Sequence, residues 1–137
     1  ENKKIVTTNG VFDILHVGHV RYLKKAKEMG DILIIGCNSD SSVKQIKGEK
    51  RPINNENDRA EVISALECVD YVVIFGENDP VKLLEQIKPN VHVKGGDYKV
   101  DDLIEREIVE VNGGEIVVVG LEEGYSTTSL IGKIGRN

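Results

Sequence analysis

Two histidines, His16 and His19, stand three residues apart near the start of the chain, with Gly18 between them. Their imidazoles can donate hydrogen bonds to a phosphate oxygen, and the glycine leaves room for a bulky ligand. A helix predicted to begin here adds free N–H groups and the positive end of its dipole, which also suit an anion. Two other interpretations stay open. In one, His16 packs in the loop and His19 caps the helix; the other, a zinc site, is disfavoured because no carboxylate or cysteine at a suitable spacing completes a tetrahedral set.

Cationic residues are concentrated after the second apolar run of an otherwise acidic chain. Lys47, Arg51 and Arg59 are the candidates for anion binding, whereas Lys44 and Lys50 are equally typical of a solvated surface. Transfer of a phosphoryl or nucleotidyl group needs such cations, because two anions must be brought together before any chemistry occurs. The pattern therefore favours a small phosphorylated ligand.

Two later segments also carry residues that suit a ligand. Lys94–Tyr98 (KGGDY) places a glycine pair between a cation and a carboxylate, so the backbone can approach a nucleoside closely, although a plain turn has the same composition. Ser126 opens the last predicted helix and alone is typical of a cap. The three further hydroxyls of Thr127, Thr128 and Ser129 favour a cradle for phosphate.

The period of the apolar residues predicts alternating strands and helices. Strands are expected at Lys4–Asn9, Asp31–Cys37, Tyr71–Phe75, Val91–Lys94 and Glu115–Val119. Helices are expected at Gly18–Gly30 with Gly30 as C-cap, at Asn54–Val69, from Asp79 and Pro80 to Ile87, around Asp101–Val111, and at Ser126–Ile134, while Asn38–Ser42 is expected to be a polar loop. This order predicts an α/β, Rossmann-like, doubly wound five-stranded parallel sheet with helices on both faces. Ligands of such sheets bind beyond the carboxyl ends of the strands, where the strand order reverses.

Composition limits the possible functions further. A chain of 137 residues with a formal charge of −5 fits one globular domain over residues 1–137 and offers no large basic surface for nucleic acid. The longest apolar block, Ile32–Ile35, is far too short to cross a membrane. Two isolated cysteines favour a reducing compartment, and we expect the cytoplasm. Because the sequence starts at Glu1 rather than Met, we expect it to be processed or to be part of a longer polypeptide.

The segment Gly10–His19, read as G-x-F-D-x-x-H-x-G-H, resembles the nucleotidyltransferase superfamily with its HxGH motif. The resemblance implies that His16 and His19 stabilise the α-phosphate of a nucleoside triphosphate while an incoming phosphate attacks and pyrophosphate leaves. It extends over nearly the whole chain to the adenylyltransferase domain of ADP-heptose synthase, through Thr8–His19, Asn38–Asp40, Lys47–Pro52, Val93–Tyr98, Asn112–Glu115 and Ser126–Thr128. That family makes ADP-heptose for lipopolysaccharide from ATP and D-glycero-β-D-manno-heptose 1-phosphate, and its domain is often fused behind a sugar kinase.

The resemblance implies a role for each candidate residue. By this resemblance, the catalytic residues are His16, His19 and Lys47. The residues that bind the sugar phosphate are Asp40, Arg51 and Arg59. The residues that bind the nucleotide are Asn9, Gly10, Phe12, Asp13, Gly18, Lys94, Gly95, Asp97, Ser126, Thr127 and Thr128. Mg²⁺ is expected to arrive with the triphosphate rather than on side chains, and dimers or higher assemblies are expected. Asp13 either organises its loop or helps to place the metal or the triphosphate.

Three other functions compete with this interpretation. Glycerol-3-phosphate cytidylyltransferases share the HxGH motif, an arginine at the position of Arg59 and the S-T-T helix start, so a CTP-dependent enzyme remains the alternative. A module that binds a nucleotide without turning it over is a second possibility, although such a module does not need paired imidazoles. A dinucleotide-dependent dehydrogenase is disfavoured because the first loop lacks G-x-G-x-x-G.

Overall fold

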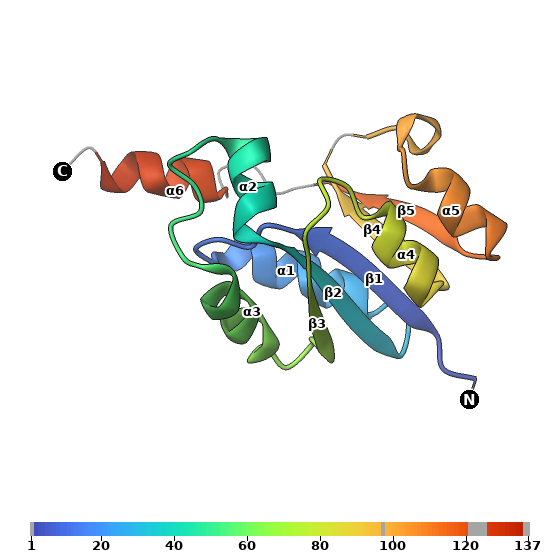
Figure 1. Ribbon diagram of the computed structural model, residues 1–137. Coiled ribbons are helices and arrows are strands. Elements are labelled where there is room, and N and C mark those ends of the chain that lie inside the picture. Colours follow the sequence, from blue (N-terminus) through green and yellow to red (C-terminus); the bar gives the residue numbers. More distant parts are fainter. Residues whose placement is uncertain (1, 97, 121–125, 136–137) are drawn as a thin grey trace.

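The computed structural model describes residues 2–96, 98–120 and 126–135. Strands and helices alternate along the chain (Figure 1). In order they are β1 (Ile5–Gly10), α1 (Val17–Lys27), β2 (Ile32–Asn38), α2 (Asp40–Lys47), α3 (Glu56–Ser64), β3 (Tyr71–Phe75), α4 (Val81–Ile87), β4 (Val91–Gly95), the 3₁₀ turn η1 (Val100–Asp102), α5 (Arg106–Val111), β5 (Glu115–Val119) and α6 (Thr127–Ile134).

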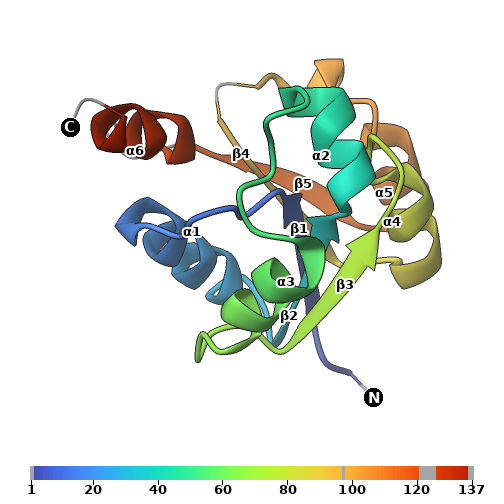
Figure 2. The ribbon, with the colours of Figure 1, turned by 60° about the vertical axis from the view of Figure 1, so that its left-hand side comes forward.

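The strands form one parallel sheet in the order β3-β2-β1-β4-β5. The chain runs outward from β1 to β3, crosses back to β4 and then runs outward to β5 on the other side. Since crossovers of this kind are right-handed, the first half places α1 and α3 on one face and the second half places α4 and α5 on the opposite face (Figure 2). The predicted doubly wound parallel sheet is confirmed, and its order reverses between β1 and β4.

Apolar side chains fill both sides of the sheet. The larger core lies under α1 and α3 and includes Val6, Leu33 and Ile63, all fully buried. A smaller cluster under α4 and α5 joins Leu84 and Val109 to strand β5. Strand β2 is covered on both faces and is a nearly continuous apolar run, which is why its position was predicted closely. The two cores hold the carboxyl ends of β1 and β4 in place.

Helix α2 was not predicted; its first residues were expected to be a polar loop. Ser39 caps it by accepting a hydrogen bond from the N–H of Ser42, and Asp40 in the first turn and Lys47 in the last complement the helix dipole. Gly48, with φ of +104°, ends the helix. Its buried residues are only Ser42 and Val43, so the apolar period that marks the other helices is missing.

Three predicted helix limits were wrong. Helix α1 ends at Lys27, before Gly30. Gly30 is instead a point of close approach, because a Cβ there would lie 2.6 Å from Val6 Cγ2 and 2.9 Å from the carbonyl oxygen of Lys4. The helix predicted at Asn54–Val69 is the shorter α3, and the one predicted around Asp101–Val111 is divided between η1 and α5. In the described part of the chain no helix is long and apolar enough to span a bilayer.

Candidate functional site

A cavity of about 480 Å³ opens at the carboxyl ends of β1 and β4, where the strand order reverses. Its wall contains nearly all the residues predicted to act on ligands: Asn9, Gly10, Phe12, Asp13, His16, Gly18, His19, Lys47, Arg51, Lys94, Gly95, Ser126, Thr127 and Thr128. The exceptions are Asp40 and Arg59, which lie outside the cavity wall, and Asp97, which lies outside the described residues. Segments far apart in the sequence therefore converge on one site.

The two histidines orient each other through the start of α1. His16 is the N-cap residue, and its Nδ1 accepts a hydrogen bond of 3.1 Å from the N–H of Gly18. His19 reciprocates, because its Nδ1 accepts from the N–H of His16 at 3.2 Å. The ring centroids lie 3.9 Å apart. Since both Nδ1 atoms accept hydrogen bonds, each neutral ring carries its hydrogen on Nε2, which can donate to a ligand.

Both rings are neutral at physiological pH. Burial lowers the pKa of His16, and burial together with the nearby His16 lowers the pKa of His19 to about 4. Capping and ligand binding are thus compatible in this geometry, because the cap uses Nδ1 of each ring and the hydrogen is carried on Nε2. The interpretation with His19 as the lone cap is wrong in one detail: His16 occupies the N-cap position.

Asp13 organises the loops around the cavity. Its side chain is buried, with only 1% of the residue surface exposed, and Oδ2 accepts a hydrogen bond from the backbone N–H of Ile53. Oδ1 accepts from the backbone N–H of Asn54 at 3.1 Å and from the side-chain amide of Asn54 at 3.3 Å. Arg51 Nε lies 3.8 Å from Oδ2. Because protein donors occupy both carboxylate oxygens, the geometry favours the loop-organising role over that of metal ligand.

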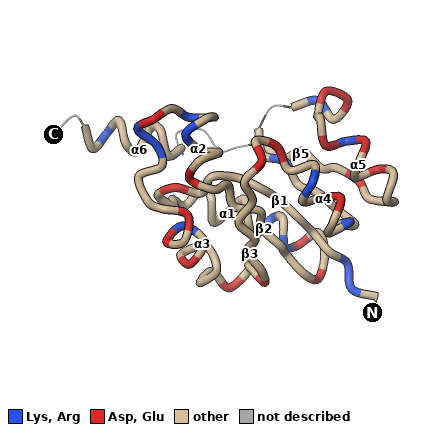
Figure 3. Tube along the Cα trace, in the orientation of Figure 1, with Lys and Arg blue, Asp and Glu red and all other residues tan. Residues whose placement is uncertain are grey.

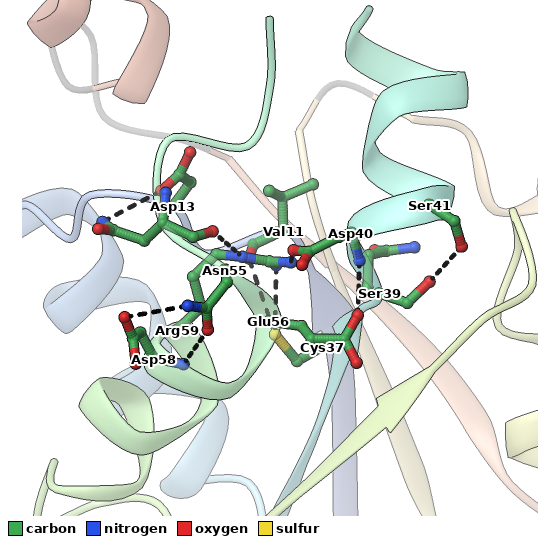
Figure 4. A network of polar contacts seen from close by, with 12 residues as sticks. Val11, Asp13, Cys37, Ser39, Asp40, Ser41, Asn55, Glu56, Asp58 and Arg59 are labelled. Carbon is green, nitrogen blue, oxygen red and sulfur yellow. Dashed lines mark hydrogen bonds and ion pairs between the residues drawn. The ribbon is translucent and has the colours of Figure 1, made fainter. Parts of the chain in front are cut away.

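Arg59 and Asp40 also act as supports. The Arg59 guanidinium is 1% exposed and donates from Nη1 to the carbonyl of Val11 at 2.7 Å and from Nε to the carbonyl of Asn54 at 2.9 Å. Its Nη2 donates to Asp40 Oδ1 at 2.8 Å (Figure 4). The predicted direct contact of these two side chains with the sugar phosphate is not supported, since the guanidinium is bonded to the loop after β1 and to the start of α2. Sequence spacing alone did not show that Arg59 points at these loops rather than into the cavity.

Cations reach the cavity from three elements. Lys47 ends α2 and Arg51 follows it, in a segment where Lys and Arg positions gather (Figure 3). Lys94 comes from the end of β4. Sequence reasoning missed Arg21 and Lys25, which line the wall from α1. Their positions three and seven residues after Gly18 lie on one helical face and offered a usable signal.

Residues 7–133 match the model of a family described as cytidylyltransferase-like. The chain belongs to this family. It is 54% identical over 134 residues to the bifunctional protein HldE of Geobacter metallireducens and 55% identical over 135 residues to that of Aliarcobacter butzleri. Each alignment covers 98% of this chain but 27% and 28% of those relatives, so the chain spans little more than a quarter of their length.

A solved structure supports the same assignment. The lipopolysaccharide core biosynthesis protein from Thermoplasma volcanium is 34% identical, with a TM-score of 0.73, and the match covers 91% of this chain and 100% of that one. The two chains therefore share their fold over most of the length of this one.

The last helix of the cytidylyltransferase-like domain is joined to the histidine loop. Ser126 caps α6, accepting from the N–H of Ser129 at 3.0 Å and donating to Ser129 Oγ at 2.9 Å. Thr127 donates its hydroxyl hydrogen to the carbonyl of Asp13 at 2.6 Å. Two of the hydroxyls predicted to bind phosphate, those of Ser126 and Thr127, are thus already hydrogen-bonded within the protein. The first turn of α6 still presents backbone N–H groups, the usual donors to phosphate at a helix start.

The predicted glycine pair has a structural reason. Gly96 has φ of +125°, and a Cβ there would lie 2.8 Å from the ring of Tyr98. That ring lines the cavity, and Lys94 Nζ lies 5.3 Å from its centroid. At the end of β4 the backbone of Gly96, the ring of Tyr98 and the ammonium group of Lys94 therefore lie close together at the cavity.

Proposed function

We propose that this chain is an adenylyltransferase domain that transfers AMP from ATP to a sugar 1-phosphate, D-glycero-β-D-manno-heptose 1-phosphate, giving ADP-heptose and pyrophosphate. The observation that carries the proposal is the reciprocal capping of His16 and His19, which gives each neutral ring an Nε2 donor within a cation-lined cavity. Identity above 50% to the bifunctional HldE proteins supports the choice of nucleotide and sugar.

The reaction is an in-line displacement. A phosphate oxygen of the sugar phosphate attacks the α-phosphorus of ATP, the bond from that phosphorus to the bridging oxygen breaks, and the electron pair leaves with pyrophosphate. No covalent enzyme intermediate is needed, because the attacking phosphate is already ionised. His16 and His19 donate from Nε2 to the α-phosphate oxygens, where charge develops, and Lys47 adds its positive charge.

The remaining residues bind rather than react. Lys94 and Gly95 form the side of the cavity that takes the nucleoside, with Asn9 and Gly10 at the end of β1. The start of α6 receives the β- and γ-phosphates. Arg51 faces the sugar phosphate and is held by Asp13, while Arg59 and Asp40 only support the loops.

Mg²⁺ enters with the triphosphate. Among the described residues no group of three or more His, Cys, Asp or Glu side chains could hold a metal ion, and protein donors occupy both oxygens of Asp13. A magnesium ion held mainly by phosphates and water fits this arrangement and supplies neutralisation of the triphosphate charge.

A CTP-dependent transfer to glycerol 3-phosphate is the second candidate. The matching family is described as cytidylyltransferase-like, and the residues that stabilise the α-phosphate serve either nucleotide equally well. The two candidates differ in the base and the acceptor and share the chemistry of the histidines.

The test is pyrophosphate release with Mg²⁺, crossing ATP and CTP with heptose 1-phosphate and glycerol 3-phosphate. We expect activity with ATP and the heptose phosphate, and a fall of about 10²–10³-fold in turnover for His16→Ala. His16→Asn is the matched control, because Asn keeps a capping oxygen but cannot place a donor where Nε2 lies. A loss in both variants assigns the effect to the imidazole. Activity with CTP and glycerol phosphate would replace the substrates, and nucleotide binding without any turnover would favour a binding module.

The proposal extends to partners and location. The described relatives are bifunctional and far longer than this chain, so we expect a sugar kinase to supply the heptose 1-phosphate, either fused or separate. Cys37 and Cys68 are free thiols, as expected in the cytoplasm. Light scattering during gel filtration tests the expected homo-oligomer.

A further inference from the structure

A row of polar side chains is buried on the face of the sheet that α4 and α5 cover. Thr7 of β1 and His92 of β4 are paired across the parallel strands, and Thr7 Oγ1 lies 2.8 Å from His92 Nδ1. Glu105, the residue before α5, places Oε2 3.6 Å from His92 Nε2. His92 is 0% exposed and Glu105 1% exposed. Neither residue has a role in the chemistry proposed above.

The charge of Glu105 fixes the hydrogens in this row. Burial raises the pKa of its carboxyl group, but His92, a backbone hydrogen bond and the charge of Lys94 together lower that pKa to about 2. The group is therefore a carboxylate at neutral pH, so His92 places its hydrogen on Nε2, facing Glu105. His92 Nδ1 then accepts from the hydroxyl of Thr7. His92 Nε2 therefore faces the carboxylate at 3.6 Å, which is longer than a hydrogen bond.

Lys94 connects this row to the cavity. It follows His92 by two positions in β4, so both side chains leave the same face of the sheet. Its Nζ lies 3.3 Å from Glu105 Oε2 and 5.3 Å from the ring centroid of Tyr98. Lys94 and Tyr98 both line the cavity. One buried carboxylate therefore lies at ion-pair distance from a cation of the cavity wall.

We propose that Glu105 is a positioning residue for the nucleotide site: its carboxylate, with His92 and Thr7 behind it, holds the Lys94 ammonium at the cavity wall before the nucleotide arrives. The proposal rests on the function proposed above only in taking the ligand to be a nucleoside triphosphate. A free lysine side chain loses much rotamer freedom when it contacts a ligand, and a lysine ordered in advance loses less. Apolar contacts hold the rest of α5, so a buried carboxylate is not needed there for packing.

The test compares nucleotide affinity in a double-mutant cycle. Calorimetry with Mg²⁺ and ATP, and separately CTP, is run on the wild type, Glu105→Gln, Lys94→Gln and the double variant. We expect Glu105→Gln to weaken binding about three- to tenfold and the double variant to bind no worse than Lys94→Gln. Glu110→Gln is the control, an exposed carboxylate on the same helix that pairs with Arg106. Unchanged or tighter binding by Glu105→Gln, or an equal loss in the Lys94→Gln background, would overturn the proposal.

A second readout does not depend on nucleotide binding. Nitrogen-15 NMR of lysine ammonium groups is recorded on the unliganded protein, with the Lys94 signal assigned by its loss in Lys94→Gln. We expect a slowly exchanging Lys94 signal that disappears in Glu105→Gln and persists in Glu110→Gln. If Glu105→Gln does not fold, Glu105→Asp keeps the charge and draws it back by one methylene, so the signal should broaden. A Lys94 signal that these Glu105 variants leave unchanged would refute the positioning role. A wild type that binds neither nucleotide would instead refute the proposed function.

Discussion

Replacing Asp13 by Asn exchanges one buried oxygen for an NH₂ group at nearly constant volume. The carboxylate oxygens face three N–H donors, from Ile53 and from the backbone and side chain of Asn54. The amide can turn its oxygen toward only one side, so its NH₂ group must face a donor on the other, and the charge opposite Arg51 is lost. A buried polar group left unsatisfied costs about 1–3 kcal/mol, and we expect the variant to lose about 2–4 kcal/mol of unfolding free energy.

Urea denaturation measures this loss directly. For a domain of this length, each kcal/mol corresponds to roughly 3–4 °C, so the melting temperature should fall by about 6–16 °C. Asp102→Asn, at an exposed carboxylate, is the control and should change stability by less than about 0.5 kcal/mol. A magnesium titration of pyrophosphate release completes the test. A half-saturating Mg²⁺ concentration that rises tenfold, with stability unchanged, would refute the loop-organising role and make Asp13 a metal ligand.

Three further outcomes follow from the packing and the charges. Gly30→Ala should destabilise the fold by about 1–3 kcal/mol in urea melts, because its Cβ would meet Val6 and Lys4, whereas Gly132→Ala in α6 meets nothing within 4 Å and should be neutral or stabilising. Arg59→Lys should cost about 2–4 kcal/mol, since one ammonium cannot replace a guanidinium bonded to two carbonyls and a carboxylate; an unchanged urea midpoint would contradict this. Because the folded pKa of His19 lies near 4, below its ordinary 6.5, the unfolded chain binds more protons in that window. Stability should therefore fall as pH drops from 6.5 to about 4, with a shallower slope in His19→Asn.

The parts of the fold that the sequence predicted are those with a strong local signal. All strands were predicted within about a residue, and β2, β3 and β5 are apolar runs bounded by polar or glycine residues. Helix α2 lacks such a signal, because it extends from the carboxyl end of β2 and buries little. Its N-cap serine and the cations of its last turn mark it only once a helix is suspected there.

The residues of the candidate site were likewise predicted where the sequence gives a local signal and missed where it does not. Residues in one contiguous motif, such as His16 and His19, line the cavity, whereas Arg59 was assigned a ligand contact and is instead buried and hydrogen-bonded to the loop after β1. His92 gave no signal in an apolar strand, and its partner Glu105 stands 13 residues later. That pair depends on the position of the turn before α5, which the sequence does not specify locally.

The capping of α1 links folding to chemistry most directly. Both Nδ1 atoms accept backbone hydrogen bonds that the helix start needs, so folding itself selects the Nε2–H form of each ring. The low pKa of His19 keeps that ring an uncharged donor, and the positive charge of the cavity comes from Lys47, Arg51 and Lys94 instead. A neutral donor needs no proton from solvent. Turnover should therefore not decline through loss of a His19 proton as pH rises above 6.5, because in the unliganded site that ring has a pKa of about 4.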